Sequence, residues 1–253
     1  MKNKKVLYVN GCSHSCGCEI SYVGSCREPA DLEKSWGGYI ARHYGLEHVN
    51  DAVPGQSNYA IYSNTIHSVL NLLETYRPEE IMVVIGWTSI DRTEVIYNNK
   101  LYRFVPAMDN LPYFKELPKA IQEAFRNFIL MTDYENNSNN EFSLIYYNMV
   151  NFLKLHNIDY CFFNAIQSIN VPQVNLLHMV DNSRPTYKIF EQIANDRKYI
   201  SPFDNSMPYY QHLKPKFDCF AEGRNHHFLE DAQQYWAKFL IDHLEDKSIY
   251  ENN

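Results

Sequence analysis

The sequence predicts a three-layer α/β/α domain built around a central parallel sheet. Two observations lead to this fold class. Short apolar runs without alternation are typical of strands buried on both faces, and segments of helical periodicity separate those runs. Strands and helices that alternate in this way are typical of doubly wound sheets. The chain length fits a single domain over residues 1–253, with an insertion at about residues 92–140.

Four segments are expected to form the strands of this sheet. They are residues 5–10, 48–53, 80–87 and 159–166, of which 80–87 (EIMVVIGW) is the strongest and 48–53 the weakest. A hairpin is expected over residues 93–106, because the alternating pattern there turns at Asn98-Asn99, a dipeptide typical of tight hairpin turns.

Helices are expected where apolar residues recur every three or four positions. These segments are residues 35–44, 58–76, 115–131, 141–155, 186–195 and 229–244. Gly45 is placed to end the first of them, and Ser57 is placed to cap the start of the second. The polar segment 135–140 is expected to be a loop, and residues 11–34 and 200–226 are expected to be largely irregular.

Composition and charge exclude several classes of protein. The formal net charge is −7 without any Lys/Arg block, which argues against a nucleic-acid partner. No apolar run approaches the roughly 18 residues of a membrane span. The basic residues 1–5 precede an apolar stretch too short for a signal peptide, so we expect a cytoplasmic protein. Association with a virus particle assembled in that compartment is compatible with this expectation.

Unusual residues follow three of the expected strands and precede the last helix. In an open parallel sheet, ligands bind at the carboxyl ends of the strands, so we expect these blocks to surround a common site. The blocks are Gly11-Cys12-Ser13-His14-Ser15-Cys16-Gly17, Pro54-Gly55-Gln56-Ser57-Asn58, Gly86-Trp87-Thr88-Ser89 and Gly223-Arg224-Asn225-His226-His227.

The four blocks, in this order, resemble those of the SGNH (GDSL-type) hydrolases. That family has a nucleophilic serine in a G-x-S-x-x-x-G loop, matched here by Gly11, Ser13 and Gly17. It has a glycine after the second strand, matched by Gly55, and a histidine before the C-terminal helix, matched by His227. The resemblance implies the flavodoxin-like α/β/α fold of these hydrolases.

The resemblance also implies roles for the matching residues. Ser13 is expected to be the nucleophile and His227 its base. The backbone N–H groups of Ser13 and Gly55 are expected to hold the oxyanion. The implied activity is that of a serine esterase that removes acyl groups from a carbohydrate or another small ester, without a cofactor.

Two positions depart from the family pattern. Thr88 stands where the family has the asparagine of G-x-N-D, a third oxyanion donor, so either the Thr88 hydroxyl or the Asn58 amide is expected to replace it. Arg224 stands where the family has an aspartate three residues before the histidine. Asn225 and Asp218 are the candidates to orient the imidazole. A Ser–His dyad, an acid from elsewhere in the chain and a decayed site are the alternatives.

Several single residues carry further predictions. Arg92 follows the third strand, where it is placed to bind an anionic group of the substrate; the alternative is an ordinary surface pair with Glu94. His226 is the alternative base, and Cys12 is the alternative nucleophile.

Four of the six cysteines cluster near the N-terminus, at Cys12, Cys16, Cys18 and Cys26. Free thiols are the expectation for a cytoplasmic chain. Together with His14 these cysteines form a candidate metal site, but their spacing is not that of structural zinc sites, so we predict no metal.

A binding or structural protein with a degenerate site on the same fold is the alternative function, favoured by the missing asparagine and aspartate. Ser35-Trp36 and Ser57-Asn58 resemble phage-encoded branches of the family, so such a protein would be a virion component or would self-associate. Under the leading hypothesis, the partner is a small-molecule or carbohydrate ester, and neither nucleic acid nor a membrane is expected.

Overall fold

The computed structural model describes residues 1, 3–105, 108–110, 112–131, 134–169, 185–221 and 226–250. The strands are β1 (Val6–Asn10), β2 (Glu47–Asn50), β3 (Ile81–Trp87), β4 (Thr93–Tyr97), β5 (Lys100–Phe104) and β6 (Asp159–Asn164). The helices are α1 (Pro29–Lys34), α2 (Trp36–Tyr44), α3 (Asn58–Leu72), α4 (Lys119–Met131), α5 (Tyr134–Leu155), α6 (Pro185–Asn195), α7 (Tyr209–Leu213), α8 (Glu230–Leu244) and α9 (Lys247–Tyr250).

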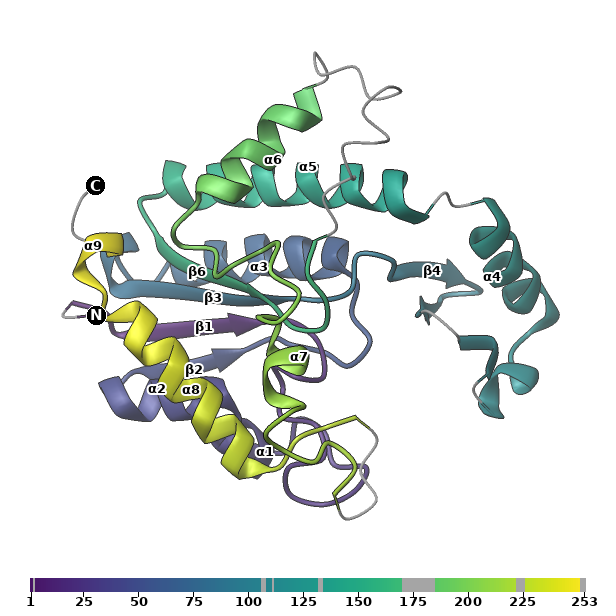
Figure 1. Ribbon diagram of the computed structural model, residues 1–253, viewed down its shortest axis with the longest axis horizontal. Helices are drawn as coiled ribbons and strands as arrows, with labels where there is room; N and C mark the ends of the chain where they lie inside the picture. The colour runs from purple at the N-terminus through teal and green to yellow at the C-terminus, as the bar shows by residue number, and fades with distance from the viewer. Residues whose placement is uncertain are drawn as a thin grey trace.

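The central sheet is parallel, with the strand order β2-β1-β3-β6. From β1 the chain crosses to β2 on one side and then returns to β3 on the other side (Figure 1). This reversal is a topological switch point, which in open α/β sheets is the place where ligands bind, at the carboxyl ends of the strands. The loops after β1, β2 and β3 therefore occupy the expected position of a site.

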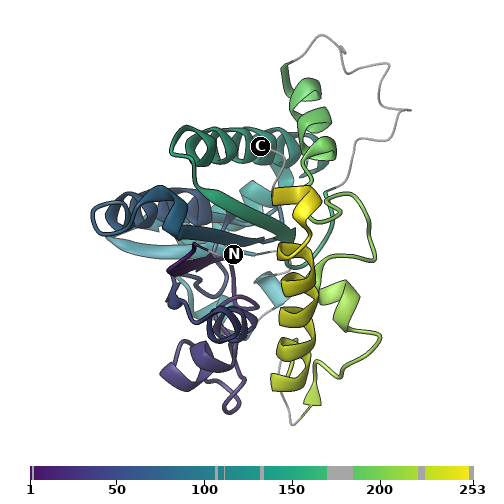
Figure 2. The ribbon, with the colours of Figure 1, turned by 90° about the vertical axis from the view of Figure 1, so that its left-hand side faces the viewer.

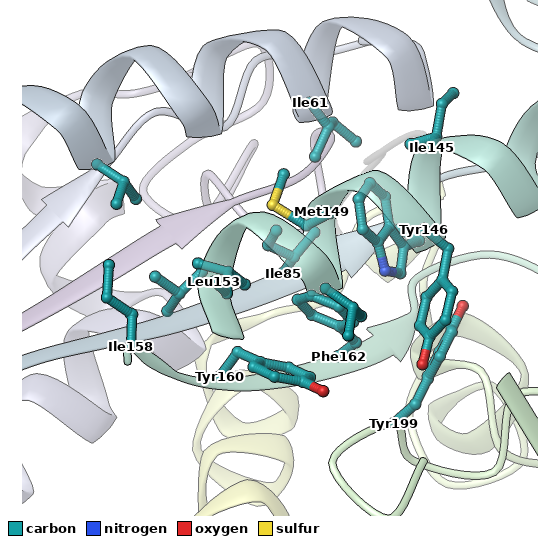
Figure 3. Close-up of a cluster of buried hydrophobic side chains, with 14 of the residues drawn as sticks. Ile61, Ile85, Ile145, Tyr146, Met149, Leu153, Ile158, Tyr160, Phe162 and Tyr199 are labelled. Carbon is teal, nitrogen blue, oxygen red and sulfur yellow. The ribbon is translucent and has the colours of Figure 1, made fainter. Parts of the chain in front are cut away.

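Helices cover both faces of the sheet, so the molecule has three layers (Figures 1 and 2). On one face, Val6 and Tyr8 of β1 pack with side chains of α3, α5 and α6 in a large buried cluster (Figure 3). On the other face, Leu7 and Val9 pack with α2 and α8, where Trp36 and other aromatic side chains fill the core. The alternation along β1 explains why its sequence is apolar throughout, since each face of a covered sheet needs apolar side chains.

The expected hairpin is present as β4 and β5, joined at Asn98 and Asn99. Both asparagines have positive φ, 49° and 58°, as a tight turn of this kind requires. The hairpin and α4 share a small core around Phe104 and Phe125 and extend beyond the carboxyl ends of the main strands (Figure 1). Arg103 of β5 pairs with Glu94 of β4 at 3.1 Å. The expected division into a single domain with an insertion stays a prediction.

Local signals account for several element boundaries. The Ser57 hydroxyl accepts a hydrogen bond from the Ala60 backbone N–H at the start of α3, and Gly45 has a left-handed φ of 65° at the end of α2. The segment expected to be a loop at 135–140 is instead helical, because α5 begins at Tyr134. The apolar face of α5 that packs on the sheet overrides the weak helix propensity of its asparagines.

Two short helices lie in segments expected to be irregular. The first is α1, with Pro29 in its first turn, where the missing N–H of proline costs nothing. The second is α7, at Tyr209–Leu213. In the part of the chain that the structure describes, no helix is long and apolar enough to cross a membrane.

Candidate active site

The loop after β1 forms a tight turn that holds Ser13 at the edge of the sheet. The Cys12 carbonyl accepts hydrogen bonds from the N–H groups of Ser15 and Cys16, at 2.9 and 3.2 Å. Gly11 passes so close to β3 that a Cβ atom there would lie 2.8 Å from the Gly86 carbonyl oxygen. The turn leaves Ser13 half-buried, whereas the side chain of Cys12 lies in the core under α2.

His227 reaches this loop from the segment that precedes α8. Its Nδ1 lies 2.7 Å from Oε2 of Glu19, and both side chains are largely buried. Because a carboxylate only accepts hydrogen bonds, Nδ1 carries the proton and Nε2 is left as the basic nitrogen. Burial lowers the pKa of His227 below its usual value, although the bond to Glu19 opposes the shift. The imidazole is therefore neutral at pH 7 and able to accept a proton.

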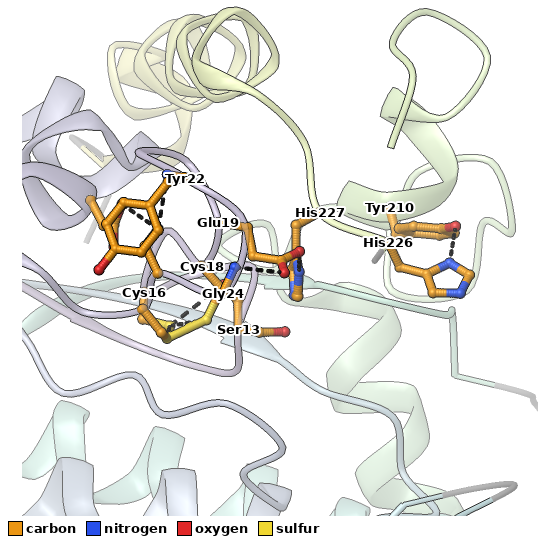
Figure 4. A network of polar contacts seen from close by, with 12 residues as sticks. Ser13, Cys16, Cys18, Glu19, Tyr22, Gly24, Tyr210, His226 and His227 are labelled. Carbon is orange, nitrogen blue, oxygen red and sulfur yellow. Dashed lines mark hydrogen bonds and ion pairs between the residues drawn. A yellow bond between two sulfur atoms is a disulfide. The ribbon is translucent and has the colours of Figure 1, made fainter. Parts of the chain in front are cut away.

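Glu19 is fixed by the loop in which it lies. Its backbone has a left-handed φ of 60°, and its N–H donates to the Ser25 carbonyl at 2.8 Å. Its second carboxylate oxygen accepts a hydrogen bond from the Gly24 N–H at 3.1 Å. A disulfide between Cys18 and Cys26 closes this loop (Figure 4). These hydrogen bonds and the disulfide therefore hold the turn that carries the carboxylate facing His227.

His14, which belongs to the Ser13 loop, packs close to His227. Its ring lies 5.5 Å from the His227 ring, centroid to centroid, and it packs beside Tyr209 and Tyr210. Since His14 directly follows Ser13, this contact brings the Ser13 turn beside His227, and Figure 4 shows Ser13, Glu19 and His227 in one view. Burial holds the pKa of His14 well below its usual value, so its ring is a neutral packing element.

Asn58 and Thr88, both predicted as oxyanion donors, are hydrogen-bonded to each other. The Asn58 amide donates to the Thr88 carbonyl at 3.1 Å, and its oxygen accepts the Thr88 N–H at 2.9 Å. The Thr88 hydroxyl is buried and has no hydrogen-bond partner among the described residues. Asn58 therefore fixes the turn after β3, while the Thr88 hydroxyl keeps its donor capacity.

Gly55 lies in the turn after β2, with a left-handed φ of 71°. The N–H of Val53 donates to the Gly11 carbonyl at 3.2 Å, which joins the turn to the Ser13 loop. Arg103 of the hairpin borders the turn, since a Cβ atom on Gly55 would lie 3.3 Å from its Cδ. The segments that carry Ser13, Gly55 and Thr88 meet at the same edge of the sheet.

The acid opposite His227 was not among the predicted residues. Asp218 is exposed, and its carboxylate accepts the Phe220 N–H at 2.8 Å, so the prediction that it orients His227 is wrong. Asn225 lies outside the described residues. Glu19 matches no family motif, and the signal available in the sequence was only a carboxylate within the same loop as Ser13.

His226 turns away from the Ser13 loop. It has a left-handed φ of 62°, and its Nδ1 lies 3.0 Å from the Tyr210 hydroxyl. It is exposed, whereas His227 is enclosed beside Glu19 (Figure 4). The geometry therefore favours His227 as the base.

The cysteines differ from the expected free thiols. Cys18 and Cys26 form a disulfide, and Sγ of Cys16 lies 3.3 and 3.4 Å from their sulfur atoms. Burial raises the pKa of Cys16 to about 12, so it stays a protonated thiol. Within the described residues, the cluster that could hold a metal contains these three cysteines, without Cys12 or His14. The expectation of no metal stays a prediction.

Comparison with models of protein families assigns the sequence to one of them. The model described as "Family of unknown function (DUF6071)" matches residues 24–248, which is most of the chain. The chain belongs to this family. The match to DUF6071 includes His227 and begins after Ser13 and Glu19. A search of curated proteins found no match to this DUF6071 chain.

Solved structures similar to this DUF6071 chain include two at the higher TM-scores. The YXIM protein of Bacillus subtilis has 14% identity and a TM-score of 0.50, over 98% of this chain and 58% of that one. An acetyl xylan esterase of the rumen bacterium Butyrivibrio proteoclasticus has 15% identity and a TM-score of 0.51, over 96% and 64%. A GDSL-like lipase of Bacteroides thetaiotaomicron has 13% identity and a TM-score of 0.45, over 96% and 89%.

The DUF6071 chain spans less than two thirds of the first two of these proteins. At such low identity the similarity shows the fold alone. The expected three-layer α/β/α fold around a central parallel sheet is confirmed (Figures 1 and 2). The resemblance to phage-encoded branches stays a prediction.

Proposed function

We propose that this chain is a serine hydrolase of the SGNH type, which removes an acyl group from a carbohydrate or another small ester. The bond between His227 and Glu19, beside the loop of Ser13, carries the proposal. A serine hydroxyl is a poor nucleophile until a neighbouring base accepts its proton, and a third group that orients the base completes the arrangement.

The proposed reaction has two steps. In the first, Oγ of Ser13 bonds to the ester carbonyl carbon while Nε2 of His227 takes the hydroxyl proton. The carbonyl re-forms as the carbon–oxygen bond to the alcohol breaks, and the imidazolium returns the proton to the alcohol. In the second step, water attacks the acyl-enzyme by the same route and releases the acid and free Ser13. Glu19 stabilises the imidazolium in both steps.

Three donors are proposed for the oxyanion. The backbone N–H groups of Ser13 and Gly55 follow from the resemblance, and the unpartnered Thr88 hydroxyl supplies the third hydrogen bond. Because Asn58 fixes the backbone of Thr88 from both sides, the hydroxyl is presented from a rigid turn. A preorganised donor of this kind costs little reorganisation when charge develops on the substrate.

Turnover of para-nitrophenyl acetate tests this function. Ser13→Ala should abolish hydrolysis while circular dichroism shows an intact fold, and Ser63→Ala, at an exposed position on α3, should behave as the unmodified protein. Unchanged turnover in Ser13→Ala would remove Ser13 from the mechanism. Folded, unmodified protein that hydrolyses no ester would favour the alternative, a binding protein with a degenerate site.

A further inference from the structure

Arg92 is a half-buried charged side chain after β3 that has no side-chain hydrogen bond or ion pair among the described residues. Its Nε and Nη1 atoms are fully buried, and in the described part of the chain neither has a hydrogen-bond acceptor. The residue lies between β3 and β4, in the segment that follows the third strand (Figure 1). Enclosing a guanidinium without an acceptor is unfavourable, because its donors lose their bonds to water and gain none.

The neighbouring acids are engaged elsewhere. Asp91 accepts a hydrogen bond from the Ser89 hydroxyl, and Glu94 accepts one from Nε of Arg103 at 3.1 Å. The alternative interpretation of Arg92, a surface pair with Glu94, is therefore wrong. Glu141 lines the same recess as Arg92 but is exposed and forms no ion pair with it. A purely structural role leaves the two buried donor atoms of Arg92 unexplained.

Arg92 lies close to Asn58, the residue that holds the turn of Thr88. Burial is the main cause of the lowered pKa values of His14 and His227, and the positive charge of Arg92 adds to it. Arg92 also borders a small recess that Asn58 lines.

We propose that Arg92 binds an anionic oxygen group of the substrate, so that the ester cleaved at Ser13 also carries a carboxylate, sulfate or phosphate. The planar fork of arginine donors matches the oxygens of all three groups. This assignment rests on the proposed function, and it adds the charge of the substrate class to it. The substrate thereby supplies the acceptor that the protein lacks.

The test compares two esters that differ in one charge. The substrates are the para-nitrophenyl monoester of succinate, which carries a free carboxylate, and its methyl-capped neutral analogue. The ratio of kcat/KM for the anionic ester to kcat/KM for the neutral ester isolates recognition of the charge. Arg92→Gln should lower this ratio by roughly ten- to a hundredfold, the usual effect of losing a hydrogen bond to a charged group.

Three further variants sharpen the result. Arg92→Lys keeps the charge without the fork and should give an intermediate ratio. Glu141→Gln removes a negative charge from the recess and should raise the ratio. Arg126→Gln, at an exposed position on α4, controls for overall charge and should leave the ratio as in the unmodified protein. A ratio in Arg92→Gln equal to that of the unmodified protein would overturn the proposal.

A binding measurement separates this inference from the proposed function. If no ester is hydrolysed, the proposed function fails, and calorimetric titration of succinate, sulfate and phosphate into the folded protein still tests Arg92. Binding that is lost in Arg92→Gln and kept in Arg126→Gln supports an anion site. Absence of binding to the unmodified protein, or equal binding to both variants, contradicts it.

Discussion

Oε2 of Glu19 lies 2.7 Å from Nδ1 of His227, although the two residues are 208 positions apart in the sequence. The glutamate comes from the loop after the first strand and the histidine from the segment before the last long helix. Both positions are at the carboxyl edge of the sheet. The proposed acid and the proposed nucleophile thus share a loop, and the proposed base contacts the acid from the segment that precedes α8.

Replacement of Glu19 by glutamine should reduce kcat by up to about 10⁴-fold, the loss seen when the acid of a catalytic triad is replaced by its amide. The amide can turn its NH2 group to the imidazole, which selects the wrong tautomer of His227 and leaves the imidazolium unstabilised. Esterase assays of Glu19→Gln measure the loss, and Glu19→Asp should recover part of it.

Glu33→Gln is the matched control, because Glu33 is exposed on α1. Its kcat should equal that of the unmodified protein. A Glu19→Gln variant with full activity and an intact fold would show that Ser13 and His227 act without an acid.

The acid limb of the pH–rate profile should lie below pH 6.5, because burial lowers the pKa of His227. Activity requires the neutral imidazole, so it is lost as the pH falls through that lowered pKa. Glu19 raises this pKa, so Glu19→Gln should move the acid limb of the residual activity to lower pH. Arg92 lowers it, so Arg92→Gln should move the limb to higher pH.

Profiles of kcat/KM against pH for the three proteins check both directions. Shifts of the same sign in the two variants, or none, would contradict the assignment of the limb to His227.

Thr88→Val should separate catalysis from stability. The change removes the hydroxyl and keeps the shape of the side chain, and the backbone bonds to Asn58 remain. Because the hydroxyl is buried without a partner among the described residues, its loss should leave the melting temperature equal or higher. Loss of one oxyanion donor should lower kcat by about 10²–10³-fold. Unchanged kcat would mean that Thr88 takes no part in holding the oxyanion.

The Cys18–Cys26 disulfide should support activity through Glu19. Closing a loop of this length stabilises the native state by about 2–3 kcal/mol in the chain-entropy account. Reduction with dithiothreitol should therefore loosen the turn that holds the carboxylate and lower kcat.

Cys26→Ser should show the lowered kcat with and without the reductant. Cys161→Ala, which removes a buried free thiol of β6, should keep the sensitivity to reductant. If kcat is the same with and without dithiothreitol, the disulfide does not support the active site.

The sheet was predictable because each buried strand needs an uninterrupted apolar run, as in Ile81–Trp87. The hairpin was predictable because Asn98 and Asn99 adopt the positive φ values that few residues tolerate. The start of α5 was not, since packing further along the helix outweighs the propensity of its polar end.

The candidate site was predictable only in part. Ser13, Gly55 and His227 stand at strand and helix ends that a motif marks. Glu19 could not be identified, because its role depends on a contact across most of the chain and on a left-handed turn that no local signal specifies.

The most direct test of the account is covalent labelling with a fluorophosphonate, followed by mass spectrometry of the peptides. The account predicts one adduct, on Ser13, formed rapidly by the unmodified protein and very slowly by His227→Gln, since the hydroxyl attacks phosphorus only when the imidazole takes its proton. Folded protein that stays unlabelled, or that is labelled equally fast without His227, would contradict it.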